Sequence, residues 1–249
     1  MNLPHWLFLL GTLCTLVAPA GAGERSLDGR LHHLRAAGPP EWSDFSDEPE
    51  APNLSVHFQA EANAGEATLR LRQQDVKQDW HVTLNGKELG RLRQDENDMV
   101  VYLPVPGGQI AHGENTLTVE QIRNSIDDIR VGQIALDERP TRQVLSQATL
   151  ELAVFDAEKN VALPSRITIL DAAGALATTG AQSGGGLAVR PGVVYTATGH
   201  AVVPLAAGEY TVYAGRGFEY GIDSFHVTLR AGERVSKRLG IRREVPTWA

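Results

Sequence analysis

Apolar and polar side chains alternate with a period of two residues through most of this chain. The segments Leu54–Phe58, Thr68–Arg72 and Trp80–Leu84 all follow this pattern. In an extended strand, successive side chains point to opposite faces, so alternation buries one face and leaves the other in water. No stretch shows the 3.6-residue period of a long amphipathic helix. The chain is therefore predicted to be all-β.

Turn residues divide the first half into short strands. Asn85-Gly86 separates two alternating runs, and this dipeptide favours a tight hairpin because both of its residues adopt positive φ. Further strands are expected at Met99–Leu103, Asn115–Val119 and Ile129–Ile134. About seven or eight strands at this spacing predict an antiparallel β-sandwich over residues 53–138.

A second sandwich is expected over residues 145–245, after a charged linker at Asp137–Arg142 that contains Pro140. Tyr210 is predicted to bury its ring and to hydrogen-bond its hydroxyl near the turn. The expected strands are Thr149–Phe155, Arg166–Leu170, Val193–Ala197, Ala201–Leu205, Glu209–Tyr213, Ser224–Leu229 and Arg234–Leu239.

The amino-terminal segment predicts export. Residues 1–22 combine a short apolar run with a small-residue end, as in a secretory signal peptide. The only cysteine, Cys14, lies inside it, so the mature chain would hold no thiol or disulfide. Residues 23–52 are rich in charge and proline and are expected to form a flexible leader, with at most one helical turn near Leu27–Ala37. The predicted location is secreted or periplasmic, with no membrane attachment after cleavage.

The net charge of −7 argues against nucleic acid as a partner. Binding to nucleic acid or to anionic lipid gains much of its affinity from cations that displace counterions. The arginine-rich stretches, such as Arg242-Arg243, are short and local. Extracellular carbohydrate or a protein partner is the more plausible ligand.

Two stretches of the first predicted sandwich resemble galactose-binding-like jelly rolls. Trp80–Leu92 contains a W-x-V-x-x-N-G hairpin, and His112–Val119 contains a G-x-N-x-L strand. Asp127–Gly132 completes the similarity, which covers about eighty residues. The resemblance implies a jelly-roll β-sandwich.

The second predicted sandwich resembles carboxypeptidase-regulatory-like and transthyretin-like domains. Val202–Tyr220 carries the strand–turn–strand segment, although Leu205–Gly208 lacks the proline that is usual there. The Arg216–Tyr220 continuation is similar to secreted metallohydrolases with a PHP-type catalytic domain. In that family a metal motif follows the arginine-rich strand, whereas this sequence ends at Thr247–Ala249. The resemblance implies the non-catalytic amino-terminal region of such a hydrolase.

The sequence offers no catalytic constellation, so we expect a non-enzyme without a cofactor. No His-x-His pair, nucleophile elbow or phosphate-binding loop is present. Two acidic segments, Asp127-Asp128 and Asp95–Asp98, could hold calcium, although such loops are more often simply solvated. No metal ligand is assigned.

Exposed aromatic faces beside polar side chains would bind sugar. The candidates in the first predicted sandwich are Trp80, Asn97, Asp98, Tyr102 and Arg130. The leading hypothesis is a secreted, non-catalytic accessory or binding protein built of two β-sandwiches. The alternative is a truncated or split PHP-type hydrolase whose catalytic domain lies outside this chain, and a third reading is a module for extracellular polysaccharide.

Overall fold

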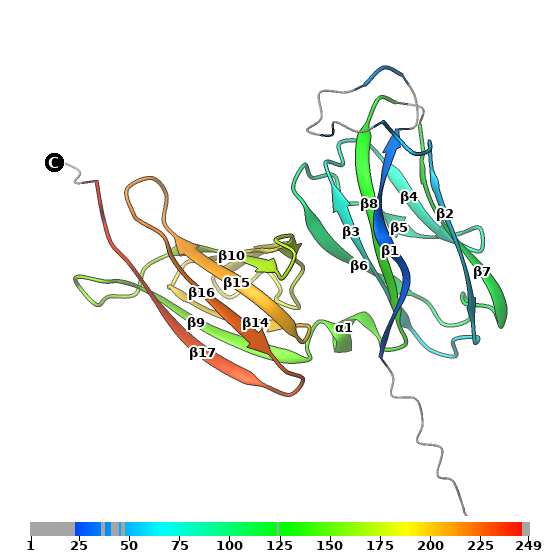
Figure 1. Ribbon diagram of the computed structural model, residues 1–249. Helices are drawn as coiled ribbons and strands as arrows, with labels where there is room; N and C mark the ends of the chain where they lie inside the picture. Colours follow the sequence, from blue (N-terminus) through cyan, green and yellow to red (C-terminus); the bar gives the residue numbers. More distant parts are fainter. Residues whose placement is uncertain (1–22, 36–37, 41–44, 46–47, 124, 246–249) are drawn as a thin grey trace, which may run out of the picture.

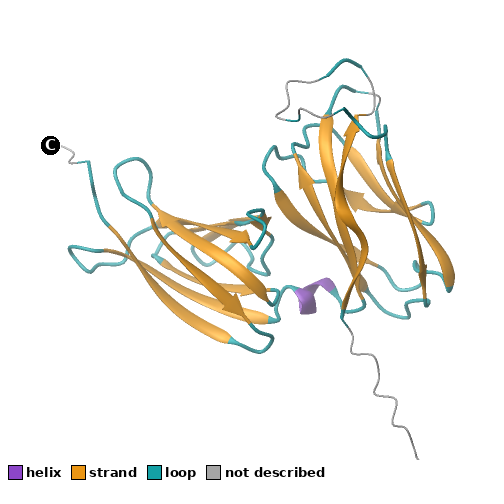
Figure 2. Ribbon diagram, in the orientation of Figure 1, coloured by secondary structure: helices purple, strands orange, loops and turns teal. Residues whose placement is uncertain are grey.

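The computed structural model describes residues 23–35, 38–40, 45, 48–123 and 125–245. The predicted signal peptide, residues 1–22, lies outside the described residues. Within them the chain forms strands β1–β17 and a single one-turn helix, α1 (Thr141–Val144). Figure 2 shows two lobes of strands joined by this helix. The all-β prediction is confirmed. In the described part of the chain, no helix is long and apolar enough to cross a membrane.

The first lobe is a sandwich of two four-stranded layers, in the order β1-β8-β3-β6 and β2-β7-β4-β5 (Figure 1). Its strands are β1 Glu24–Arg35, β2 Leu54–Ala60, β3 Ala67–Gln74, β4 Trp80–Leu84, β5 Lys87–Arg91, β6 Met99–Val105, β7 Gly113–Gln121 and β8 Asp128–Asp137. All pairings within these two layers are antiparallel. Alternate side chains from both layers, such as Leu71, Val82 and Leu117, meet in one core.

The Asn85-Gly86 hairpin forms as predicted. Leu84 pairs with Lys87 across the turn, and Asn85 and Gly86 have φ values of 52° and 73°. The Asn85 side chain also donates to the Asn115 amide oxygen at 2.7 Å, which ties the turn to β7. Positive φ at both central residues matches the right-handed twist of the two strands.

The expected flexible leader is wrong for residues 24–35, which form β1 with no helical turn. This strand pairs with β8 from Glu24 opposite Asp137 to Arg35 opposite Asp128. The charged residues that suggested disorder have partners in the fold. The buried carboxylate of Asp128, for example, accepts from Arg35 Nε at 2.6 Å. Gly132 permits the close approach, since a Cβ there would lie 1.9 Å from the carbonyl oxygen of Arg30.

The second lobe is a smaller sandwich with its own core. One layer has the order β12-β13-β10-β15-β16, and the other has the order β14-β9-β17. Its strands are β9 Ala148–Asp156, β10 Ser165–Asp171, β11 Leu176–Ala177, β12 Leu187–Arg190, β13 Val193–Thr196, β14 His200–Leu205, β15 Gly208–Gly215, β16 Asp223–Leu229 and β17 Arg234–Ile241. The sequence did not reveal β11 and β12, which have two and four residues.

Tyr210 lies as predicted. Its ring is buried, and its hydroxyl donates to the carbonyl oxygen of Ala206 at 2.9 Å. Burial raises the pKa of this hydroxyl above its ordinary value, so the group stays a neutral donor. The bond fixes the turn between β14 and β15.

Candidate functional site

The two sandwiches share one continuous sheet. Strand β11 of the second sandwich pairs in parallel with β6, the edge strand of the first, through Leu176 opposite Met99 and Ala177 opposite Val100. The Leu176 side chain packs against the core of the first sandwich. An edge strand normally exposes a row of unpaired backbone groups, and here β11 covers part of that row. The junction therefore combines backbone pairing with apolar burial.

Asp98 organises the polar side of this junction. Its carboxylate accepts from Arg72 Nε at 2.7 Å and from Gln74 Nε2 at 2.9 Å, and its carbonyl oxygen accepts from the Leu176 N–H at 2.9 Å. The hydrogen bond to Asp98 raises the pKa of Arg72 above its ordinary value, against the opposing effect of burial. Arg72 also donates to the carbonyl oxygen of Ala173 at 3.4 Å, so one partly buried ion pair contacts both sandwiches.

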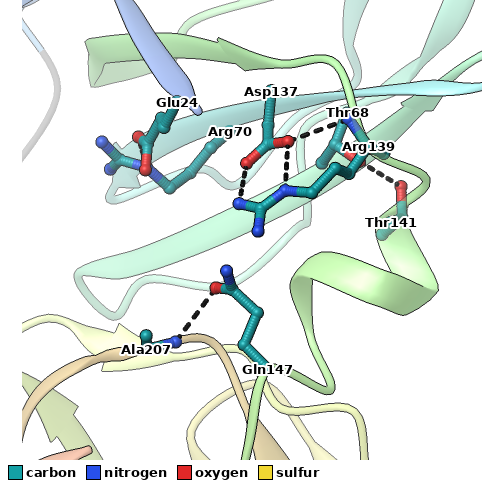
Figure 3. A network of polar contacts seen from close by, with 8 residues as sticks. All are labelled: Glu24, Thr68, Arg70, Asp137, Arg139, Thr141, Gln147 and Ala207. Carbon is teal, nitrogen blue, oxygen red and sulfur yellow. Dashed lines mark hydrogen bonds and ion pairs between the residues drawn. The ribbon is translucent and has the colours of Figure 1, made fainter. Parts of the chain in front are cut away.

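Hydrogen bonds on both sides of α1 hold the short linker in place, as drawn in Figure 3. Arg139 binds both oxygens of Asp137, and Thr68 donates to the carbonyl oxygen of Arg139 at 2.7 Å. Burial raises the pKa of Asp137, but the hydrogen bonds from Arg139 outweigh it, so the pKa lies below its ordinary value. On the other side of the helix, Gln147 accepts from the Ala207 N–H at 3.1 Å. The helix is thus held at both ends.

A cleft opens beside this junction, where β11 ends and β6 continues. Its main hollow has a volume of about 510 Å³. A smaller hollow of about 220 Å³ adjoins it and shares three lining residues with it, Arg93, Thr178 and Pro191. The other residues that matter for its chemistry are Asp79, Arg91, Gln94, Tyr102, Thr179 and Arg190.

Local turns place the lining residues. Arg190 precedes Pro191-Gly192, a two-residue turn in which Gly192 has φ 63°. Proline followed by a residue with positive φ is the pattern of a type II turn. A Cβ at Gly192 would lie 2.8 Å from the Cα of Leu176, so the turn packs directly on β11. Arg93 follows β5, and its backbone N–H donates to the Gln73 side chain at 2.8 Å.

The residues that line this cleft include three arginines, Arg91, Arg93 and Arg190, and one carboxylate, Asp79. Arg91 lies 3.6 Å from Asp79 and 3.6 Å from Glu88, which is a loose contact for an exposed side chain. Among the described residues, neither Arg93 nor Arg190 forms a side-chain hydrogen bond or an ion pair. Arginine presents a planar fork that suits carboxylate, sulfate and phosphate groups.

A buried hydroxyl completes the wall of the cleft. Thr179 is 7% exposed, and its Oγ1 has no hydrogen-bond partner in the described structure. Most buried polar atoms in proteins are satisfied, so such an atom points to an absent partner. The neighbouring Thr178 hydroxyl, in contrast, donates to the carbonyl oxygen of Val100 at 2.7 Å.

A hollow at the amino-terminal end of β1 is less open to a ligand, because the polar groups of Asn63 and Arg25 already have partners. This hollow has a volume of about 450 Å³ and is lined by Arg25, Asn63 and Glu61, among others. Asn63 donates to the carbonyl oxygens of Gly65 and Pro106 and accepts from the Ile110 N–H. Arg25 donates to the carbonyl oxygen of Gln59 at 2.8 Å.

The five ligand-binding residues predicted from the sequence do not form one site. Asp98 and Tyr102 lie at the junction, where burial raises the Tyr102 pKa to about 12. Asn97 bonds to Asp95 in an exposed loop, and Arg130 lies 4.4 Å from the centre of the Phe45 ring.

Trp80 cannot offer a face to sugar, which corrects its assignment. It is fully buried, and its indole N–H donates to Asp127 Oδ2 at 2.8 Å. Successive side chains of a strand point to opposite faces, and the Trp80 side chain at the start of β4 lies on the face that packs into the core. No sequence pattern pointed to Arg93 or Arg190, because the two residues lie almost a hundred positions apart in the chain.

The two acidic segments considered for calcium are engaged in the fold. Asp127 accepts from Trp80 and from the Gln78 N–H, and Asp128 binds His33 and Arg35. Asp95 accepts from the backbone N–H and side chain of Asn97. In the parts of the chain that the structure describes, no group of three or more His, Cys, Asp or Glu side chains could hold a metal.

No protein-family model matches the chain, and no curated protein matches it. Among solved structures it is similar to a form of BcpA, the major pilin subunit of Bacillus cereus, with 12% identity, 77% of this chain covered and a TM-score of 0.31. The match spans 64% of the length of that pilin chain. The pilus 2b backbone protein of group B streptococcus matches with 12% identity over 77% of this chain and 92% of its own, at a TM-score of 0.29.

The β-glucuronidase of Ruminococcus gnavus matches with 12% identity over 84% of this chain and 44% of its own, at a TM-score of 0.29. Likenesses this distant do not relate the chain to a pilin or to a glucuronidase. The β-sandwich architecture rests on the strands described above, and the relation to PHP-type hydrolases stays a prediction.

Proposed function

We propose that this chain is an exported, non-catalytic binding protein whose ligand occupies the cleft between its two sandwiches. The ligand class is an anionic extracellular molecule, either an acidic carbohydrate or a protein. The observation that carries the proposal is the pair Arg93 and Arg190, two arginines from different sandwiches that line one cleft and have no carboxylate partner among the described residues.

The junction supports this function because it fixes the cleft. Strand β11 and the Arg72–Asp98 pair hold the two walls in one arrangement. A preformed site loses less conformational freedom on binding than a site that has to be assembled.

The charge distribution makes these local arginines decisive. Residues 24–139 contain 21 Asp and Glu against 12 Lys and Arg, whereas residues 140–249 contain 9 against 11. An anion therefore gains nothing from the overall field of the first sandwich and depends on short-range contacts. Such contacts between exposed groups weaken as salt rises.

The test is binding of two anionic polymers, polygalacturonate and poly-glutamate, with dextran as the neutral control. Wild-type protein is expected to bind at least one anionic polymer and not dextran. The double variant Arg93→Glu/Arg190→Glu should weaken binding by about tenfold or more, as loss of charge-assisted hydrogen bonds predicts.

A matched control is Lys87→Glu/Arg142→Glu, which changes the net charge equally at exposed positions outside the cleft. This control should bind like wild type. Equal weakening by both double variants would show that only net charge matters, and absence of binding to both polymers would overturn the proposal.

A further inference from the structure

The outer edge of β6 is only partly covered. Its inner edge pairs with β3 along its whole length, from Met99 opposite Gln73 to Val105 opposite Ala67. On the outer side, β11 pairs only with Met99 and Val100. Within the described chain, Val101–Val105 has no strand on that side, and residues 101–103 line the main hollow of the cleft.

The pairing pattern tells which backbone groups face the cleft. The carbonyl oxygens of Asp98 and Val100 point outward, because they accept from the Leu176 N–H and from the Thr178 hydroxyl. Along a strand, the N–H and C=O of every second residue point to the same side. The backbone N–H and C=O of Tyr102 and the C=O of Pro104 therefore point outward as well.

The proline fits this placement. A proline cannot donate to a ladder, so strands tolerate it on an open edge. Pro104 carries no N–H, and its position in the outward-facing series leaves the inner pairing with β3 intact. The open segment thus offers one donor and two acceptors in a short row.

We propose that the ligand of this cleft is an extended acidic peptide that adds as a strand to the open edge of β6; this rests on the proposed function above. The backbone of the peptide would pair with the N–H and C=O of Tyr102, and its carboxylates would bind Arg93 and Arg190. Strand addition to a sheet edge is a general mode of peptide recognition, in which backbone bonds give affinity and side-chain contacts give specificity.

The features of the cleft favour a peptide over an acidic sugar. A sugar acid can satisfy the arginines but has no regular series of N–H and C=O groups to match the outward row of β6. Because β6 offers only a short row, the bound segment needs about three to five residues at roughly 3.3 Å per residue.

The experiment uses the capped peptide Glu-Val-Glu-Val-Glu and a galacturonate trimer of equal charge. Amide hydrogen exchange reports on Tyr102, and calorimetry gives the affinities. We expect the peptide to bind at least tenfold more tightly than the trimer and to slow exchange of the Tyr102 amide. The Arg93→Glu/Arg190→Glu variant should weaken the peptide about tenfold, and Lys87→Glu/Arg142→Glu should not.

Two N-methylated peptides test the backbone pairing. They carry the methyl group on the central glutamate or on the valine that follows it. Adjacent amides of a strand face opposite sides, so one of the two peptides should lose binding and the other should keep it. The strand-addition proposal is overturned if both methylated peptides bind like the parent peptide. It is also overturned if the galacturonate trimer binds as tightly as the peptide while Arg93→Glu/Arg190→Glu weakens both ligands. In either case the anion-binding function stands. If neither ligand binds, both proposals are overturned.

Discussion

The two sandwiches have similar architecture but are held together by different means. Of the buried polar or charged residues that the structure describes, nine lie in the first sandwich and four in the second. Those of the first include Asp127, Asp128, Arg72 and His33, whereas Asp156 is the one ionisable member in the second. The second sandwich instead relies on glycine turns, with positive φ at eight of its glycines.

This difference teaches how each sandwich fixes its strand register. A buried ion or hydrogen-bonded side chain is costly unless it meets its partner, so it penalises any shifted pairing. Asp128 fixes β1 in this way, because only one register brings it to both His33 and Arg35. A glycine turn fixes register by geometry, as Gly192 does between β12 and β13. The first sandwich should therefore respond to pH and charge, and the second to backbone substitutions.

The largest effect is expected from Asp128→Ala. This change leaves Arg35 and His33 in the interior without their carboxylate partner, and such a loss typically costs about 3–5 kcal/mol. Urea unfolding should show the first sandwich weakened by that amount, with Trp42 and Trp248 replaced by phenylalanine so that the fluorescence reports on Trp80. Since Asp128 contacts only the first sandwich among the bonds described, the second should unfold at its usual urea concentration. A loss below about 1 kcal/mol would contradict the role of buried charge, on the scale of a surface pair.

A smaller effect, confined to the second sandwich and the junction, is expected from Gly192→Ala. Its φ of 63° and the 2.8 Å approach of a Cβ to the Leu176 Cα make alanine both strained and crowded. We expect a loss of about 2–3 kcal/mol, consistent with strained positions in general. The matched control is Gly217→Ala, which has φ 68° with no atom within 4 Å of the added Cβ. Equal losses at both positions would show that crowding against β11 contributes nothing.

The contacts of His32 should contribute to the acid sensitivity of the first sandwich. In this sandwich, the carboxylates of Asp28 and Glu50 lie 2.7 and 2.9 Å from the two ring nitrogens of His32. The hydrogen bond to His32 lowers the pKa of Glu50. Burial raises the pKa of Asp28, but the hydrogen bonds with Arg30 and His32 have the larger effect, so the pKa lies below its ordinary value.

A carboxyl whose pKa is lower in the folded state than in the unfolded state stabilises the fold at pH values above its ordinary pKa. This contribution is lost as pH falls through the folded-state pKa. The stabilisation is thus complete above the ordinary values of 4.5 and 3.8, and it is lost as pH falls from these values through the lowered folded-state pKa values. Thermal unfolding at pH 6, 4 and 3 checks this, with His32→Gln as the comparison. The variant should lose part of the acid sensitivity of the first sandwich, and an unchanged pH profile would contradict the role of His32.

The smallest effect is expected from Glu24→Gln. Glu24 pairs with Arg70 at the surface, where the two side chains are 42% and 28% exposed. Exposed ion pairs contribute about 0–1 kcal/mol. Chemical denaturation should detect little change, and a loss above about 2 kcal/mol would mean that β1 depends on this surface pair more than on its buried anchors.

The sequence predicted those parts of the fold that local chemistry determines. The Asn85-Gly86 hairpin and the Tyr210 hydroxyl bond follow from turn geometry and from burial of an amphipathic ring. The strand at Glu24–Arg35 was missed because its charged residues are neutralised by partners about a hundred residues away, which a local pattern does not reveal.

The candidate site was missed for the same reason. Arg93 and Arg190 meet only through the pairing of β11 with β6, and β11 has two residues, too few to show an alternating pattern. Tyr102 was singled out as an exposed ring, yet it matters here through its outward-facing backbone. Tertiary contacts between the sandwiches, rather than any motif, create the cleft.

The joined arrangement of the two sandwiches, on which the cleft depends, is tested most directly by the exchange rate of the Leu176 amide hydrogen. This N–H donates to the Asp98 carbonyl oxygen at 2.9 Å across the junction. If the two sandwiches form one sheet, Leu176 should be protected nearly as well as amides between β3 and β6, such as that of Leu103. Exchange as fast as that of the exposed turn residue Gly217 would show that the sandwiches separate and that the cleft has no fixed shape.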